Sequence, residues 1–128
     1  ERNREPTSEG RPALLLVRLE MKAHPTKRKE LHQTLLAWVG PTREARGCLA
    51  CRFYRNTETE DHFLLTQEWK RPSDFERHLR SEDFRILCGA IRLLCQPAET
   101  VFSASSDTAQ TEALERTLGV VLEKAPAA

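Results

Sequence analysis

Residues 62–69 read HFLLTQEW, and the alternation in this stretch decides the fold class. Successive side chains of a β-strand point to opposite faces of a sheet, so every second residue here shares one face. The residues expected to face the core are Phe63, Leu65, Gln67 and Trp69. The polar run 56–61, NTETED, comes directly before the stretch, and a second alternating run covers 48–55. These pieces together predict a β-hairpin.

Outward from the hairpin, segments with the two-residue period of a strand and segments with the period of a helix follow one another along the chain. Alternating runs predict further strands over residues 13–21 and 99–104. Apolar residues at a spacing of three to four predict three helices. The first runs from Pro25 to Gly40 and is ended by Gly40-Pro41. The second begins at Pro72, and the third runs from Ser81 to the residue before Pro97. The order is strand, helix, strand, strand, helix pair, strand.

This order predicts an α+β fold, the ferredoxin-like sandwich, with helices packed on one face of an antiparallel sheet. The domain is expected over residues 13–104. Residues 1–12 are too polar to bury a core and are expected to be a flexible lead-in. Residues 105–128 form a tail that holds either a short helix over 111–124 or no regular structure.

The sheet face away from the helices is expected to be half apolar. The side chains assigned to it include Leu14, Leu16, Ala50, Tyr54 and Leu64. Apolar surface of this kind is most simply covered by a second sheet, so the pattern favours a homodimer.

The composition excludes several classes of partner. Twenty Lys and Arg side chains stand against 19 Asp and Glu, and the formal net charge is +1. So balanced a chain supplies no strong field for nucleic acid or for an anionic membrane. No apolar run approaches the roughly 20 residues of a membrane-spanning helix. Four cysteines in 128 residues do not make a disulfide scaffold, so a cytoplasmic domain with reduced thiols is expected.

The familiar motifs of metal and cofactor chemistry are missing from the sequence. Cys48 and Cys51 have the spacing of a redox pair, but on a strand an offset of three places them on opposite faces. Cys88 and Cys95 are two helical turns apart, too far to bridge. The four histidines have no metal-ligand spacing, and neither a phosphate-binding glycine loop nor a nucleophilic serine motif occurs. No metal or cofactor is therefore expected.

Arginines gather around the second strand, at positions 43, 46, 52 and 55. Nucleic-acid binding would need aromatic side chains beside them, and only Tyr54 shares a face with Arg52. A solvated rim is the favoured interpretation. Arg52 and Arg55 remain candidates for a residue that steers an anionic or phenolate ligand.

Trp69 and His78 suggest a site between the sheet and the helices. Trp69 ends the third strand on its apolar face, and His78 lies on the helix that follows. The residues expected to wall a pocket beside them are Val17, Phe53, Phe63, Leu65, Phe84 and Leu87. Such a pocket suits a flat hydrophobic molecule. The alternative is a core that contains Trp69, with His78 turned to solvent.

Three stretches of the sequence resemble the antibiotic biosynthesis monooxygenase domain family: Gly47-Cys48-Leu49, the run Phe63 to Trp69, and the run Phe75 to Phe84, FERHLRSEDF. The resemblance covers about residues 13–104. It implies a dimeric α+β barrel and the oxidation of phenols or quinols by dioxygen without metal or flavin. It also implies a catalytic pair, with Trp69 as pocket wall and polar contact and His78 as base or hydrogen-bond partner. His24 is a second polar candidate.

Other functions are left open by the same resemblance. Haem-degrading members place a histidine where this sequence has Cys88, in an apolar helix seam, so haem degradation is disfavoured. A branch that isomerises sugar phosphates keeps weak support from Lys22, Arg52 and Arg55. The main alternative is a non-catalytic dimeric module that binds a hydrophobic metabolite or a partner.

Overall fold

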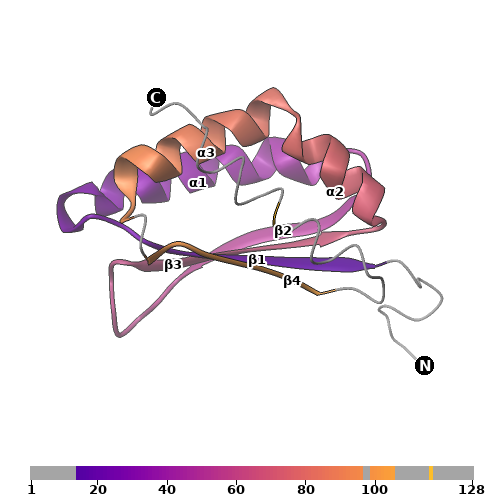
Figure 1. Ribbon diagram of the computed structural model, residues 1–128. Helices are drawn as coiled ribbons and strands as arrows, with labels where there is room; N and C mark the ends of the chain where they lie inside the picture. Colours follow the sequence, from indigo (N-terminus) through magenta and orange to yellow (C-terminus); the bar gives the residue numbers. More distant parts are fainter. Residues whose placement is uncertain (1–13, 97–98, 106–115, 117–128) are drawn as a thin grey trace.

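The computed structural model describes residues 14–96, 99–105 and 116. Its strands form one antiparallel sheet in the order β2-β3-β1-β4. They are β1 (Leu15–Lys22), β2 (Cys48–Arg55), β3 (His62–Trp69) and β4 (Val101–Ser105). The helices are a 3₁₀ turn, η2 (Pro25–Lys27), and α1 (Arg28–Arg43), α2 (Pro72–Leu79) and α3 (Glu82–Leu94). All of them cover the same face of the sheet (Figure 1), which confirms the ferredoxin-like α+β fold.

The core lies between the sheet and this helix layer. In β1 every second side chain is buried, and Leu15 and Leu19 lie opposite Trp69 and Leu65 of β3. α1 and α3 bury their apolar faces against this surface and against each other. Burial of these faces removes apolar area from water and is the main force that joins the two layers.

α1 does not end at Gly40-Pro41 as the sequence analysis predicts. It begins later, at Arg28, and continues through Pro41 to Arg43. One of the clashes that keeps a proline out of a helix is with the Cβ of the residue before it, and Gly40 has no Cβ. The Thr42 hydroxyl, buried after Pro41, donates a hydrogen bond to the Trp38 carbonyl oxygen one turn back in the same helix, at 3.0 Å.

A β-bulge changes which side chains of β2 face the core. Cys48 lies opposite Trp69 and Ala50 opposite Glu68, so Leu49 is the extra residue. Leu49 is therefore exposed, and Cys48 turns to the core face that Cys51 also occupies. The expectation that these two thiols face opposite ways is wrong. Burial raises the pKa of Cys51 to about 12 and also raises that of Cys48, so both thiols stay protonated at neutral pH.

Gly47 fixes the place of α2 relative to β2. Its φ of 85° lies in the left-handed region, and a Cβ added there would lie 2.2 Å from Asp74 Cγ. Asp74 is buried in the first turn of α2 and pairs with Arg77 at 3.1 Å. This close approach brings the start of α2 over the end of the sheet where Trp69 lies.

The opposite sheet face is open in the single chain. Leu16, Tyr54 and Val101 are exposed on it, while Leu14, Ala50 and Leu64 are partly covered. Pairing with a second copy stays a prediction. No helix in the described part of the chain is long and apolar enough to cross a membrane. The predicted lead-in over 1–12 and, apart from residue 116, the predicted helix over 111–124 lie outside the described residues.

Candidate functional site

Trp69 and His78 lie together in the core, at a ring-centroid distance of 4.9 Å. Trp69 comes from the last position of β3 and His78 from the last turn of α2. Three further rings complete what we call the aromatic cluster: Phe84 of α3 lies 5.4 Å from His78, Trp38 of α1 lies 5.6 Å from His78, and Phe75 of α2 lies 5.8 Å from Trp69. The helices thus surround the imidazole with π-systems.

Burial holds His78 in its neutral form. The side chain is 5% exposed, and desolvation lowers its pKa to about 4, against a small opposing influence of Asp83. Both indoles of the cluster have acceptors, since Trp38 Nε1 donates to the Asp83 carbonyl oxygen at 2.7 Å and Trp69 Nε1 to Gln67 Oε1 at 3.1 Å. His78 Nε2 has no hydrogen-bond partner among the described residues. A buried polar atom in that state is unusual and available to a ligand.

Gln67 is a further polar residue of the site. The sequence analysis places it on the core face of its strand but assigns it no function. It is 3% exposed. Its Nε2 makes no hydrogen bond of ordinary geometry within the described chain, although the amide lies close enough to the Cys51 thiol to favour the thiolate slightly. A glutamine at an inward position of an otherwise apolar alternation, in HFLLTQEW, is the signal that could have identified it.

None of the cavities found among the described residues is an open pocket beside Trp69. The space between sheet and helices narrows to a void of about 10 Å³, lined by Val17, Leu19, Leu65, Gln67, Phe75, Phe84 and Phe102. That volume suits roughly one water molecule and no aromatic ring. The rings of Phe75 and Phe102 are stacked, with centroids 6.3 Å apart and an interplanar angle of 9°. They occupy space in which the sequence analysis expects a pocket.

The predicted pocket walls separate into two groups. Val17, Leu65 and Phe84 line the void, whereas Phe63 and Leu87 are buried in the same core without reaching it. Phe53 is at the sheet edge, in an edge-to-face contact with His32 at 5.6 Å.

The polar candidates away from the core also separate. His24 is half-buried before η2, where its backbone N–H donates to the Leu94 carbonyl oxygen at 2.9 Å. Arg52 is exposed and lies opposite Thr66 in the sheet register. Arg55 lies at the end of β2 and lines a separate cavity beside α1. None of the three lines the void.

Residues suited to a metal or to haem do not converge here. Among the residues that the structure describes, no three His, Cys, Asp or Glu side chains are grouped as metal ligands. Cys88 is fully buried in α3, and burial raises the pKa of its thiol to about 12. A thiol that stays protonated is a poor ligand for haem iron, so this residue does not fit that cofactor.

Solved structures share this fold at low sequence identity. A conserved protein from Methanosarcina mazei Go1 is 19% identical, over 80% of this chain and 100% of that one, with a TM-score of 0.71. A Deinococcus radiodurans protein, provisionally assigned as an antibiotic biosynthesis monooxygenase, is 20% identical, over 72% and 90% of the two chains, with a TM-score of 0.67. A mutant of SnoaB from Streptomyces nogalater, a cofactor-independent oxygenase, is 13% identical, over 73% and 91%, with a TM-score of 0.64.

At these identities the structural likeness establishes the fold alone. No curated protein sequence matches the chain. A family model, described as antibiotic biosynthesis monooxygenase, matches residues 14–87. That span is more than half of the chain and contains both Trp69 and His78. The protein therefore belongs to the antibiotic biosynthesis monooxygenase family.

Proposed function

We propose that the protein is a cofactor-independent monooxygenase that oxidises a phenolic or quinol ring with dioxygen at the aromatic cluster. The observation that carries the proposal is His78: a neutral imidazole in the core, with an unpartnered Nε2, in contact with the indole of Trp69. Aromatic walls with one polar acceptor suit a flat hydroxylated ring. Family membership and the oxygenases among the structural neighbours support the same class.

The reaction balances as RH₂ + O₂ → RO + H₂O, with all four electrons that reduce dioxygen supplied by the substrate. An imidazole whose pKa is about 4 is a weak base toward a resting phenol. We therefore assign His78 first as hydrogen-bond acceptor for the substrate hydroxyl. Once an electron leaves the ring, the hydroxyl becomes a strong acid and its proton passes to Nε2. Exclusion of water by the packed rings protects the radical pair that forms.

Neither His78 nor Trp69 lines the void, so a substrate reaches them only if side chains of the core move, and Phe102 is the candidate for the first movement. It lies on β4, an edge strand that pairs only with β1 in the described sheet, and it is half-buried over the void. Rotation of this ring away from Phe75 would join the void to solvent without breaking the pairing of the inner strands.

Oxygen consumption with a panel of hydroquinones and polycyclic phenols tests the proposal. We expect protein-dependent uptake above autoxidation, reduced about 10- to 100-fold in His78→Phe, which keeps a ring in the cluster and removes the acceptor. Trp69→Phe should also lose activity. His62→Gln, which changes an exposed imidazole on the same strand as Trp69, is the matched control and should retain it.

A second candidate function rests on the lining of the void. Apart from Gln67 the void is lined by apolar side chains, which also suits a module that opens to bind a hydrophobic metabolite without turnover. Such a module would show a rise in melting temperature with an aromatic ligand such as 2-naphthol, yet no oxygen uptake. Uptake at the autoxidation rate with every substrate would reject the monooxygenase, and the thermal shift then decides whether the binding module stands.

We also propose that the protein functions as a homodimer through its open sheet face. Leu16, Tyr54 and Val101 supply exposed apolar area there, and a hollow of about 380 Å³ lies between Tyr54, Leu64 and Val101. A second sheet would cover both. Sedimentation of the wild type as a dimer and of Tyr54→Asp as a folded monomer would support this arrangement; a monomeric wild type at high concentration would oppose it.

A further inference from the structure

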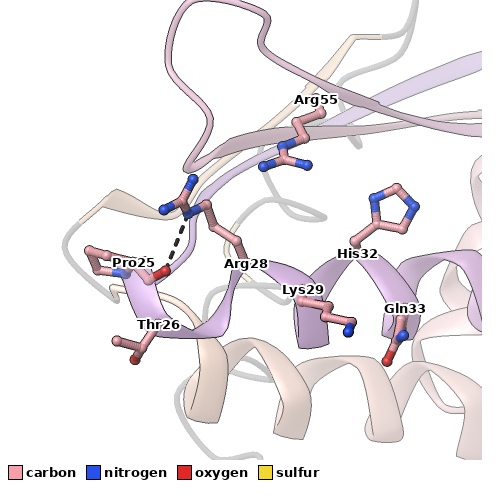
Figure 2. A pocket seen from close by; sticks show the side chains of 7 residues that line it. All are labelled: Pro25, Thr26, Arg28, Lys29, His32, Gln33 and Arg55. Carbon is pink, nitrogen blue, oxygen red and sulfur yellow. Dashed lines mark hydrogen bonds between the residues drawn. The ribbon is translucent and has the colours of Figure 1, made fainter.

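A second cavity lies at the opposite end of β2 from the bulge, between that strand and the start of α1. We call it the basic pocket. It has a volume of about 500 Å³ and is lined by Pro25, Thr26, Arg28, Lys29, His32, Gln33 and Arg55. Figure 2 shows the side chain of Arg55 extending from the strand toward Arg28 and His32 of the helix. Four of the lining residues carry basic groups and, within the described part of the chain, none is acidic.

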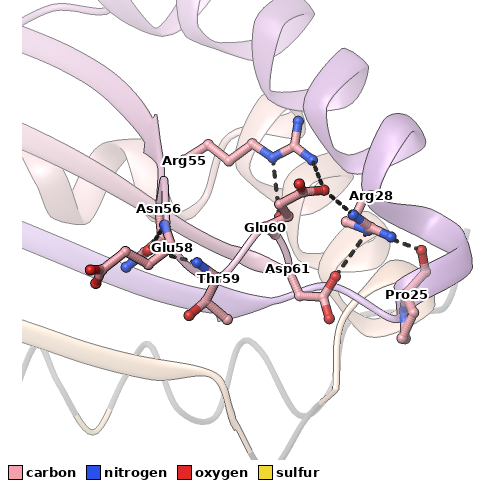
Figure 3. A network of polar contacts seen from close by, with 8 residues as sticks. All are labelled: Pro25, Arg28, Arg55, Asn56, Glu58, Thr59, Glu60 and Asp61. Atoms are coloured by element: carbon pink, nitrogen blue, oxygen red, sulfur yellow. Dashed lines mark hydrogen bonds and ion pairs between the residues drawn. The ribbon is translucent and has the colours of Figure 1, made fainter.

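The two arginines of this pocket share one acceptor, the carboxylate of Glu60. Glu60 Oε1 pairs with Arg28 Nη1 and lies 3.5 Å from Arg55 Nη2. Arg55 Nε also donates to the Glu60 carbonyl oxygen at 3.1 Å (Figure 3). A single carboxylate oxygen thus bridges two guanidinium groups, each of which can donate several hydrogen bonds.

The surrounding contacts fix the arginines more firmly than they fix the Glu60 side chain. Arg28 Nε lies 3.0 Å from Asp61 Oδ1 and donates to the Pro25 carbonyl oxygen at 3.2 Å, so the guanidinium stays in place without Glu60. The Arg55 guanidinium carbon lies 5.7 Å from the centroid of the Phe63 ring. The Glu60 side chain, in contrast, is 65% exposed.

The hairpin that carries Glu60 is itself ordered by a side chain. Asn56 Oδ1 accepts hydrogen bonds from the backbone N–H groups of Glu58 and Thr59 at 2.7 and 2.9 Å. These contacts order the backbone that leads to Glu60, whereas its side chain is 65% exposed and can rotate into water without unfolding the loop.

We infer that the basic pocket binds a small organic dianion, with a phosphate group or a pair of carboxylates, and that the Glu60 carboxylate is its built-in competitor. The ligand's charged group takes the position between Arg28 and Arg55 that Glu60 Oε1 now holds. Lys29 and His32 also line the cavity and offer further donors, and a volume of about 500 Å³ leaves room for an organic body. A doubly charged group with more oxygens satisfies the two guanidinium forks better than one carboxylate oxygen can.

This site is separate from the aromatic cluster, because no residue that lines the basic pocket belongs to the cluster or lines the void. Its ligand need not be the oxidised ring. The inference therefore stands or fails independently of the oxygenase proposal, and an inactive protein could still bind the anion.

Calorimetric titration with inorganic phosphate and with succinate tests the inference, at about pH 8, where phosphate is mostly a dianion, and at constant ionic strength. Glu60→Gln removes the competing charge and keeps the side-chain shape, so we expect binding to tighten about 3- to 10-fold. Arg55→Gln should weaken it by at least about 10-fold, because it removes charge-assisted hydrogen bonds. The relative affinity of the two probes identifies phosphate or paired carboxylates as the preferred group.

Arg52→Gln is the matched control, since Arg52 is an exposed arginine of the same strand on the opposite sheet face. It should bind both anions as the wild type does. An equal loss in Arg52→Gln and Arg55→Gln would mean general attraction to surface charge and would overturn the site. Unchanged or weaker binding in Glu60→Gln would contradict the role of Glu60 as competitor. If neither anion gave a heat of binding with the wild type or any variant, the whole inference would be overturned.

Discussion

The aromatic cluster and the basic pocket lie over the same sheet, but they are built in opposite ways. In the cluster, rings from three helices and one strand exclude water, and the one titratable group there, His78, is held neutral. In the pocket, three long cationic side chains and an imidazole line an open cavity, and the carboxylate between the two arginines is mostly exposed to water.

The difference separates stability from binding. Burial of large rings stabilises the fold by kilocalories per residue, and any charge placed among them is costly. Exposed ion pairs contribute little to folding because water already solvates their partners. The cluster should therefore respond to mutation and to pH through the free energy of unfolding, whereas the pocket should respond through its affinity for anions.

The largest effect is expected from Trp69→Ala. Trp69 is fully buried and contacts both His78 and Phe75. Removing an indole from a packed core costs about 3–5 kcal/mol, through lost transfer free energy and the cavity left behind. Urea unfolding followed by far-ultraviolet circular dichroism measures this change in the free energy of unfolding.

Leu36→Ala gives the reference for that measurement, because Leu36 is 60% exposed on α1 and its truncation leaves no cavity. It should change the free energy of unfolding by less than about 0.5 kcal/mol. If Trp69→Ala were as mild as Leu36→Ala, the cluster would not be the packed centre of the fold, and the contrast with the pocket would disappear.

The second effect is a loss of stability in acid that originates at His78. Its pKa is lowered from 6.5 to about 4 on folding, so between these values the unfolded chain binds a proton that the native state does not. Stability is then full above about pH 6.5 and falls as the pH drops toward 4. From about pH 7.5 to about pH 5 the free energy of unfolding should decrease by about 2 kcal/mol on account of this residue.

Urea unfolding at both pH values, in the wild type and in His78→Phe, isolates the contribution. The variant cannot titrate at this position and should lose that part of the pH dependence, while His62→Gln, changed at an exposed site, should keep it. Equal pH dependence in the wild type and His78→Phe would show that His78 is protonated without penalty. The site would then be wetter than the packed rings indicate.

Much of the fold could be read from the sequence because period-two and helical patterns report directly which side chains are buried. The alternation in HFLLTQEW and in β1 predicted both the strands and their core faces. The bulge at Leu49 could not be read, since one inserted residue reverses the alternation at Cys48 and the nearby Gly47 is equally typical of the turn before a strand. The passage of α1 through Pro41 depended on Gly40, a residue that ordinarily signals the end of a helix.

The site was less accessible to the same reasoning. Trp69 and His78 were predicted as a pair and they do meet, because strand and helix positions determine which rings face each other. The closure of the pocket could not be predicted, since it depends on how Phe75 and Phe102 pack. Nor could the basic pocket, because Arg28 and Arg55 are 27 positions apart and meet only through the hairpin that carries Glu60 (Figure 3).

Among variants of the two sites, the smallest effect on stability is expected from Arg28→Gln, although this residue makes more polar contacts than any ring of the cluster. Its partner Glu60 stays mostly solvated after folding, with a side chain that is 65% exposed, while the side chains of Arg28 and Asp61 are 36% and 23% exposed. The free energy of unfolding should fall by less than about 1 kcal/mol, while the affinity for phosphate or succinate falls sharply. Urea unfolding and calorimetry on the same sample separate the two quantities. If the free energy of unfolding fell by several kilocalories per mole, the ion pairs of Arg28 would be holding the hairpin against α1 and would stabilise the fold as the buried rings do. A small decrease would mean that the Arg28 guanidinium is available to bind a ligand.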